Sequence, residues 1–140
     1  MWNGTDWQDT NHLDAQILDV NDMGQSDSPG EVAWLGTSGM AVCVYPDNQA
    51  GTLDWATWTD GAGWTLGVDL AVPGKGTGES ALLRTFPGQD RVIAVFSGSN
   101  GGLYSATFDG STWTLTNGIA PLETDLSTIG AAPFSFAFER

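Results

Sequence analysis

The chain has 140 residues and a mass of 14.8 kDa, the size of one ordinary domain that can bury a core without disulfides. Its four Lys and Arg and seventeen Asp and Glu give a net charge of −13, which excludes nucleic acid as a partner because binding would need a basic surface. No apolar stretch reaches the length of a transmembrane helix, so membrane insertion is not expected. Nineteen Gly and seven Trp indicate many short strands and turns.

Residues 1–30 are predicted to hold an orphan hairpin, formed by the last two strands of a four-stranded unit, followed by an acidic connecting loop. A Gly turn separates Trp2 from Trp7, and the residues that follow are too rich in Asp, Asn and Gly for a helix. Asp19, Asn21 and Asp22 could offer oxygen ligands to Ca²⁺, the one cofactor that the sequence suggests. Their spacing does not fit an EF-hand loop, and a solvated acidic loop is the simpler interpretation.

Residues 31–80 are predicted to form a first unit of four antiparallel strands, over 31–36, 40–46, 52–59 and 62–67. The second strand is almost continuously apolar, which indicates burial on both faces. The single Cys43 lies in it, and a small buried side chain is the simplest interpretation. Asp60 and Gly61 form a strong hairpin signal between the last two strands.

Residues 81–130 repeat the pattern, with strands expected over 81–86, 91–97, 102–109 and 112–116. Asp109 and Gly110 occupy the hairpin position, and the tryptophans that close the two hairpins, Trp64 and Trp113, lie 49 residues apart. A repeat of this length that carries strand and turn signals is typical of propeller blades. The sequence therefore predicts an all-β chain with β-propeller-like blades of four antiparallel strands.

Residues 131–140 are predicted to contribute the first strand of a third unit, because Phe134, Phe136 and Phe138 alternate along it. The chain would then hold about two and a half blades, with an orphan hairpin at one end and an orphan strand at the other. Unpaired strand edges bind other strands. We expect these phenylalanines, with Trp2 and Trp7, to complete blades with other copies of the chain, as a ring or a filament.

No catalytic residue is assigned, because the sequence lacks the motifs of metalloproteases, serine hydrolases and phosphate-binding loops. A glycosidase-like pair of carboxylates stays a third possibility. With seventeen Asp and Glu in the chain, the sequence does not single out one pair that would lie in a cleft. Trp34, Trp55 and Tyr104 are candidate stacking platforms for a sugar, with Arg84 as a polar partner. Blade packing explains these aromatic residues equally well.

The Trp-Asn/Asp-Gly-x-x-Trp motifs, the run 38–45 and the pattern over 134–139 resemble bacterial and archaeal extracellular repeats that form β-propeller-like blades. A more distant resemblance is to fungal fucose-binding propeller lectins, whose blades each repeat an Arg, a Glu and an aromatic residue. Arg84 and Arg91 have no basic counterpart in the first unit, which weakens that second resemblance. The resemblance to the extracellular repeats implies an extracellular or cell-surface location.

These observations lead to one main hypothesis and one alternative. The main hypothesis is a non-enzymatic structural or adhesive repeat protein that assembles by sharing strands between copies. The alternative is a carbohydrate-binding module, with glycans as partners, that uses pockets between blades.

Overall fold

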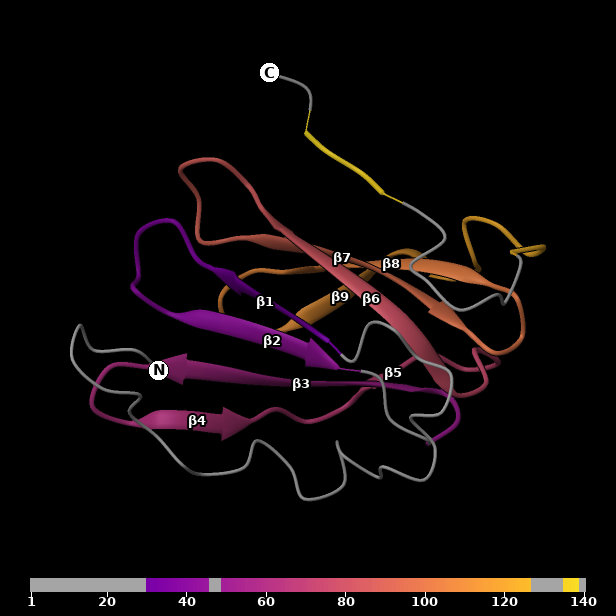
Figure 1. The fold of residues 1–140 in the computed structure, drawn as a ribbon, viewed down its shortest axis with the longest axis horizontal. Coiled ribbons are helices and arrows are strands. Elements are labelled where there is room, and N and C mark those ends of the chain that lie inside the picture. Colours follow the sequence, from indigo (N-terminus) through magenta and orange to yellow (C-terminus); the bar gives the residue numbers. More distant parts are fainter. Residues whose placement is uncertain (1–29, 46–48, 127–134, 139–140) are drawn as a thin grey trace.

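The computed structural model describes residues 30–45, 49–126 and 135–138, and all regular structure in these ranges is β-strand (Figure 1). The all-β prediction is therefore confirmed for the described residues. Trp2, Trp7, Asp19, Asn21, Asp22 and Phe134 lie outside the described ranges. The strands form two antiparallel sheets that follow one another along the chain.

The first sheet is a meander in which each predicted strand of the first unit is present. Its strands pair in the order β1-β2-β3-β4, and a short additional strand, β5, pairs with the start of β3. The strand β2 is buried along its whole length, as its apolar run predicts. The bounds are β1 (Glu31–Trp34), β2 (Ala41–Tyr45), β3 (Thr52–Thr59), β4 (Gly63–Leu66) and β5 (Leu70–Ala71).

The second sheet repeats this meander in the order β6-β7-β8-β9. It begins at Gly78, whereas the sequence predicts that the second unit starts at residue 81. The earlier start arises because the pairing of β6 with β7 continues to Gly78 through a register shift between Gly78 and Ser80. Its last strand runs three residues beyond the predicted end. The bounds are β6 (Gly78–Thr85), β7 (Val92–Gly98), β8 (Leu103–Phe108) and β9 (Trp113–Ile119).

The two sheets share one cross-strand register, so that side chains line up in the same rows. We call residues at the same place in the two sheets equivalent. One row holds Trp34, Ala41, Trp58 and Trp64 in the first sheet and Thr85, Val92, Phe108 and Trp113 in the second. The next row holds Val32, Cys43, Ala56 and Leu66, and Leu83, Ala94, Ala106 and Leu115.

The connections between strands repeat as well. The amide of Leu35 donates to Met40 O at 2.8 Å, and the amide of Phe86 donates to Arg91 O at 2.9 Å. After the fourth strand of each sheet the chain returns to a glycine with positive φ, Gly51 in the first sheet and Gly101 in the second. Each of these glycines accepts one backbone hydrogen bond from the returning segment. The repeat therefore covers the turns and return segments in addition to the four strands.

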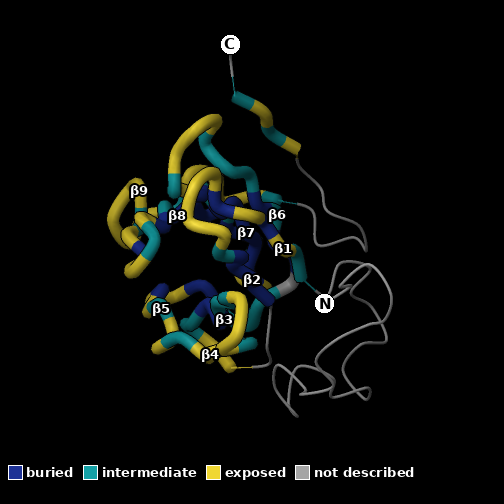
Figure 2. The backbone as a smooth tube through the Cα atoms, turned by 90° about the vertical axis from the view of Figure 1, so that its left-hand side faces the viewer, coloured by how far each residue is buried: buried dark blue, intermediate teal, exposed yellow. Residues whose placement is uncertain are grey.

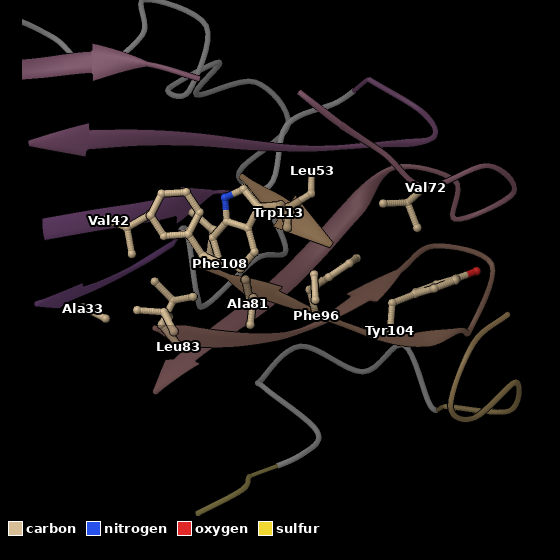
Figure 3. Packing of buried hydrophobic residues seen from close by; sticks show 14 of the residues in the cluster. Ala33, Val42, Leu53, Val72, Ala81, Leu83, Phe96, Tyr104, Phe108 and Trp113 are labelled. Atoms are coloured by element: carbon tan, nitrogen blue, oxygen red, sulfur yellow. The ribbon is translucent and has the colours of Figure 1, made fainter. Parts of the chain in front are cut away.

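The two sheets stack in the same orientation, so that opposite faces meet. We call the face that carries the rows above, with Trp64 or Trp113, the front face of each sheet, and the other its back face. Figure 2 shows the buried segments between the sheets, and Figure 3 shows side chains from both meeting there. The main core thus joins the back of the first sheet to the front of the second, with these members: Ala33, Leu35, Val42, Val44, Leu53, Val72, Ala81, Leu83, Val92, Ala94, Phe96, Tyr104, Ala106, Phe108 and Trp113.

The edges of β1 and β6 are joined by side chains and not by a backbone ladder. The Glu31 carboxylate accepts a hydrogen bond from the Leu83 amide, and it forms an ion pair with Arg84 at 2.8 Å. The Thr85 hydroxyl donates to Trp34 O at 2.6 Å. These contacts satisfy backbone groups that a free strand edge would expose.

The described part of the C-terminal segment, residues 135–138, lies against the second sheet without strand pairing. The ring of Phe138 is 4.4 Å from that of Phe86, and Phe136 lies 5.7 Å from the Arg84 guanidinium carbon. Residues 135–138 are held within this chain by aromatic and cation–π contacts and not by strand pairing. The orphan strand over 131–140, which we expect to pair with another copy, stays a prediction.

Candidate functional site

A groove of about 420 Å³ opens between the two sheets. One wall comes from β3 and the segment around β5, and the other comes from the hairpin that joins β8 to β9. Its lining combines two indole rings with two hydroxyl groups and one carboxylate, a composition suited to a small polar ligand with an apolar face. The lining residues are Trp55, Val68, Asp69, Leu70, Ala71, Ser111, Thr112 and Trp113.

Trp55 is fixed in this groove by contacts on several sides. Its Nε1–H donates to Val68 O at 2.8 Å, and its ring lies 5.2 Å from Phe108 and 6.4 Å from Trp113. Gly67 lies directly against the ring: a Cβ added at this position would fall 2.0 Å from a ring carbon of Trp55. The groove therefore presents one rigid, half-buried indole.

Trp113 lines the groove, and its indole N–H is buried without a hydrogen-bond partner among the described residues. Its side chain is 8% exposed, and its buried Nε1–H has no hydrogen-bond partner in the part of the chain that the structure describes. A buried donor without a partner destabilises a fold by about 1–3 kcal/mol. The ring is retained here through its packing on Phe108 and Trp55.

The hairpin that supplies Ser111 and Thr112 is ordered by the carboxylate of Asp109. Its Oδ1 accepts hydrogen bonds from the amides of Ser111 at 2.9 Å and Thr112 at 2.8 Å. These bonds to the charged form, led by that from the Thr112 amide, lower the pKa of Asp109 to about 2. Asp109 is thus a turn residue, as the Asp-Gly hairpin signal predicts.

Of the four residues predicted to contact a ligand, the structure brings only Trp55 to the groove. Trp34 lies on the front face of the first sheet, partly exposed, and its ring is edge-to-face with that of Trp58 at a centroid distance of 5.5 Å. Tyr104 is 3% exposed and stacks on Phe96 in the core. Arg84 is paired with Glu31 at the sheet edges.

A carboxylate of the second sheet clasps a turn of the first. Asp90 accepts hydrogen bonds from the Thr37 amide at 2.7 Å, the Thr37 hydroxyl at 2.5 Å and the Ser38 amide at 2.9 Å. These hydrogen bonds, first that from the Thr37 hydroxyl, lower the pKa of Asp90. No local sequence signal could reveal the clasp, because its partners lie more than fifty residues apart.

Asp90→Asn is expected to lower the melting temperature by a few degrees at pH 7, because an amide presents one acceptor oxygen where the carboxylate presents two. The pKa of Asp90 is below the ordinary value of 3.8, so its contribution is complete above that pH and is lost as the pH falls through the lowered value. Thermal melts from pH 7 to pH 2 should therefore converge for wild type and variant at the acid end. A constant difference over the whole range would contradict this account.

The described residues offer no metal centre and no reactive thiol. They contain no group of three or more His, Cys, Asp or Glu side chains that could hold a metal ion. Burial raises the pKa of Cys43 to about 11, which keeps the thiol protonated. Nor does a helix capable of crossing a membrane occur in these ranges.

Comparison of the chain with protein-family models, curated proteins and solved structures finds no match. The resemblance to extracellular propeller-like repeats therefore stays a prediction from the motifs.

Proposed function

We propose that this protein is a non-enzymatic structural or adhesive repeat protein of the cell exterior, built of β-propeller-like units that stack on one another and on other copies. The observation that supports this most is the front-to-back packing of two sheets with the same register. In this packing the back face of one unit meets the front face of the next. The same contact between faces could therefore be repeated by further units.

The use of the charged side chains supports a role without catalysis. Asp109 holds a hairpin, Asp90 clasps a neighbouring turn, and Glu31 and Arg84 join two strand edges. Each of these groups stabilises the fold or the contact between units. Buried aliphatic and aromatic side chains carry the rest of that contact, as is common where two repeat units bury a shared surface.

The test of this proposal is the mass and shape of the full chain in solution. Light scattering coupled to size exclusion, over a hundredfold range of concentration, should give particles heavier than 14.8 kDa whose mass rises with concentration. Negative-stain electron microscopy should show rings or filaments at the highest concentration. A mass of one chain at every concentration would reject assembly between copies.

A second candidate function, carbohydrate binding, is favoured by the groove beside the unsatisfied Nε1–H of Trp113. A neutral sugar could stack on an indole, and one of its hydroxyl oxygens could accept a hydrogen bond from the Trp113 Nε1–H, while Ser111 and Thr112 offer further polar partners. A neutral ligand suits a chain of net charge −13 better than an anionic one.

Tryptophan fluorescence during titration with a panel of neutral monosaccharides tests this candidate. Trp113→Phe keeps an aromatic ring and removes the donor, so we expect affinity to fall about tenfold, the value of one hydrogen bond. Trp64→Phe is the matched control, because Trp64 is equivalent to Trp113 and does not line the groove. Unchanged affinity in Trp113→Phe, or no binding by wild type, would reject the groove as a sugar site.

A further inference from the structure

We infer that Asn117 is a site of intramolecular deamidation, where the chain converts its own side-chain amide into a carboxylate with water as the only co-reactant. The inference does not rest on the proposed function. It follows from comparing two Asn-Gly pairs of the second sheet, at residues 117–118 and 100–101, which are alike in sequence and differ in how the fold holds them.

The reaction needs a glycine amide next to an asparagine side chain. The nitrogen of Gly118, once it has lost its proton to hydroxide, attacks Cγ of Asn117. A bond forms between these two atoms, the bond from Cγ to Nδ2 breaks, and ammonia leaves. Water then opens the five-membered succinimide at either carbonyl, which gives aspartate or isoaspartate. Glycine favours the attack because it has no Cβ to crowd its nitrogen.

The side chain of Asn117 is exposed and loosely held. It lies two residues beyond Leu115, the last residue of β9 that pairs with β8. Its Nδ2 is 3.3 Å from Ala120 O and 3.5 Å from Pro121 O, both longer than an ordinary N–H···O hydrogen bond. A Cβ added at Gly118 would meet nothing within 4 Å. The amide of Asn117 can therefore turn toward the Gly118 nitrogen at little cost.

The side chain of Asn100, in contrast, is fixed at both of its polar atoms. Its Nδ2 donates to the hydroxyl of Tyr104 and to Gly74 O, each at 2.7 Å. Its Oδ1 accepts a hydrogen bond from the Gly102 amide at 2.9 Å. The Tyr104 side chain is itself buried in the core. Rotation of the Asn100 amide toward the following nitrogen would break all three hydrogen bonds.

The nitrogen that would attack Asn100 is also engaged. The Gly101 N–H donates to Gly98 O at 2.9 Å, and Gly101 O accepts from the Leu126 amide at 2.9 Å. The backbone at this glycine is thus held on both sides. Because several hydrogen bonds must break before Asn100 can react, we expect Asn117 to react more than about tenfold faster than Asn100.

The test incubates the full chain in a mildly alkaline buffer, once folded and once in concentrated urea. Chymotrypsin, which cuts after aromatic residues, then separates the peptide that ends at Tyr104 from the one that begins at Thr114, and mass spectrometry measures the acid form of each. In the folded chain the peptide from Thr114 should convert more than about tenfold faster. In urea both peptides should convert at similar rates, because the hydrogen bonds that protect Asn100 are lost.

A variant tests the cause of the protection. Tyr104→Phe keeps the ring and removes one hydrogen-bond partner of Asn100, so the conversion of Asn100 should rise about fivefold while that of Asn117 stays the same. Tyr45→Phe makes the same change in the first sheet and is the matched control, in which both rates should stay as in wild type. Circular dichroism verifies that each variant is folded, and the comparison with urea needs no variant.

Three results would overturn the inference. The first is an Asn100 that converts as fast as Asn117 in the folded chain. The second is an Asn117 that converts more than about tenfold more slowly in the folded chain than in urea, which would show that the fold protects it. The third is an unchanged rate at Asn100 in folded Tyr104→Phe, which would show that the side-chain hydrogen bonds do not set the difference.

Discussion

Phe108→Ala is expected to lower the free energy of unfolding by about 3–5 kcal/mol, the loss that follows when a large aromatic side chain is removed from a core. Phe108 is fully buried, and its ring lies 5.2 Å from Trp55 of the first sheet and 5.1 Å from Trp113 of its own. Its removal would leave a cavity bounded by both sheets. We therefore expect the two sheets to lose stability together.

Urea unfolding followed by tryptophan fluorescence measures this loss. A single transition, shifted to lower urea with an unchanged slope, is the expected result. Leu122→Ala, at an exposed position, is the control and should change stability by no more than about 0.5 kcal/mol. A loss below about 1 kcal/mol in Phe108→Ala, or separate transitions of the two sheets, would show that they do not share one core.

Gly67→Ala is expected to cost about 3 kcal/mol, the upper range for forcing a methyl group into a packed site. The new Cβ would lie 2.0–2.3 Å from three atoms of the Trp55 ring, which is rigid and has to move as a whole. Movement of the ring would break its hydrogen bond to Val68 O and its contact with Phe108. The groove between the sheets would change shape at the same time.

A double-mutant cycle identifies the cause of that loss. In a Trp55→Leu background the clash is absent, so Gly67→Ala should then cost less than about 1 kcal/mol. Thr65→Ala, at an exposed position two residues earlier, controls for changes to the edge strand itself. Equal costs of Gly67→Ala in both backgrounds would mean that the backbone at residue 67, and not the indole, requires glycine.

The strands could be predicted from the sequence because their signals are local. The apolar run of β2, the Asp-Gly pairs at residues 60 and 109 and the recurrence of the tryptophan motif each fall within a few neighbouring residues. The short β5 has no such signal, because two residues pair with β3 only after the chain has turned back. The C-terminal phenylalanines alternate as a strand would, yet Phe136 and Phe138 are held by ring contacts.

The groove and the clasp could not be predicted in the same way, because they depend on how the two sheets stack. Trp55 and Trp113 meet across the interface, and no pattern within either segment indicates the other. The sequence predicts that Tyr104 contacts a ligand, because the first unit has no matching aromatic residue. The alternation of its strand instead directs the side chain into the core.

The front-to-back order of the sheets gives the stack a polarity. The outer face of the first sheet carries indole rings at Trp34, Trp58 and Trp64, and the outer face of the second sheet carries the smaller Ile93, Ser105 and Thr107. If copies add to one another as we propose, the two ends of a particle would therefore differ in chemistry. A molecule that binds only the indole end would then stop addition there without blocking the other end.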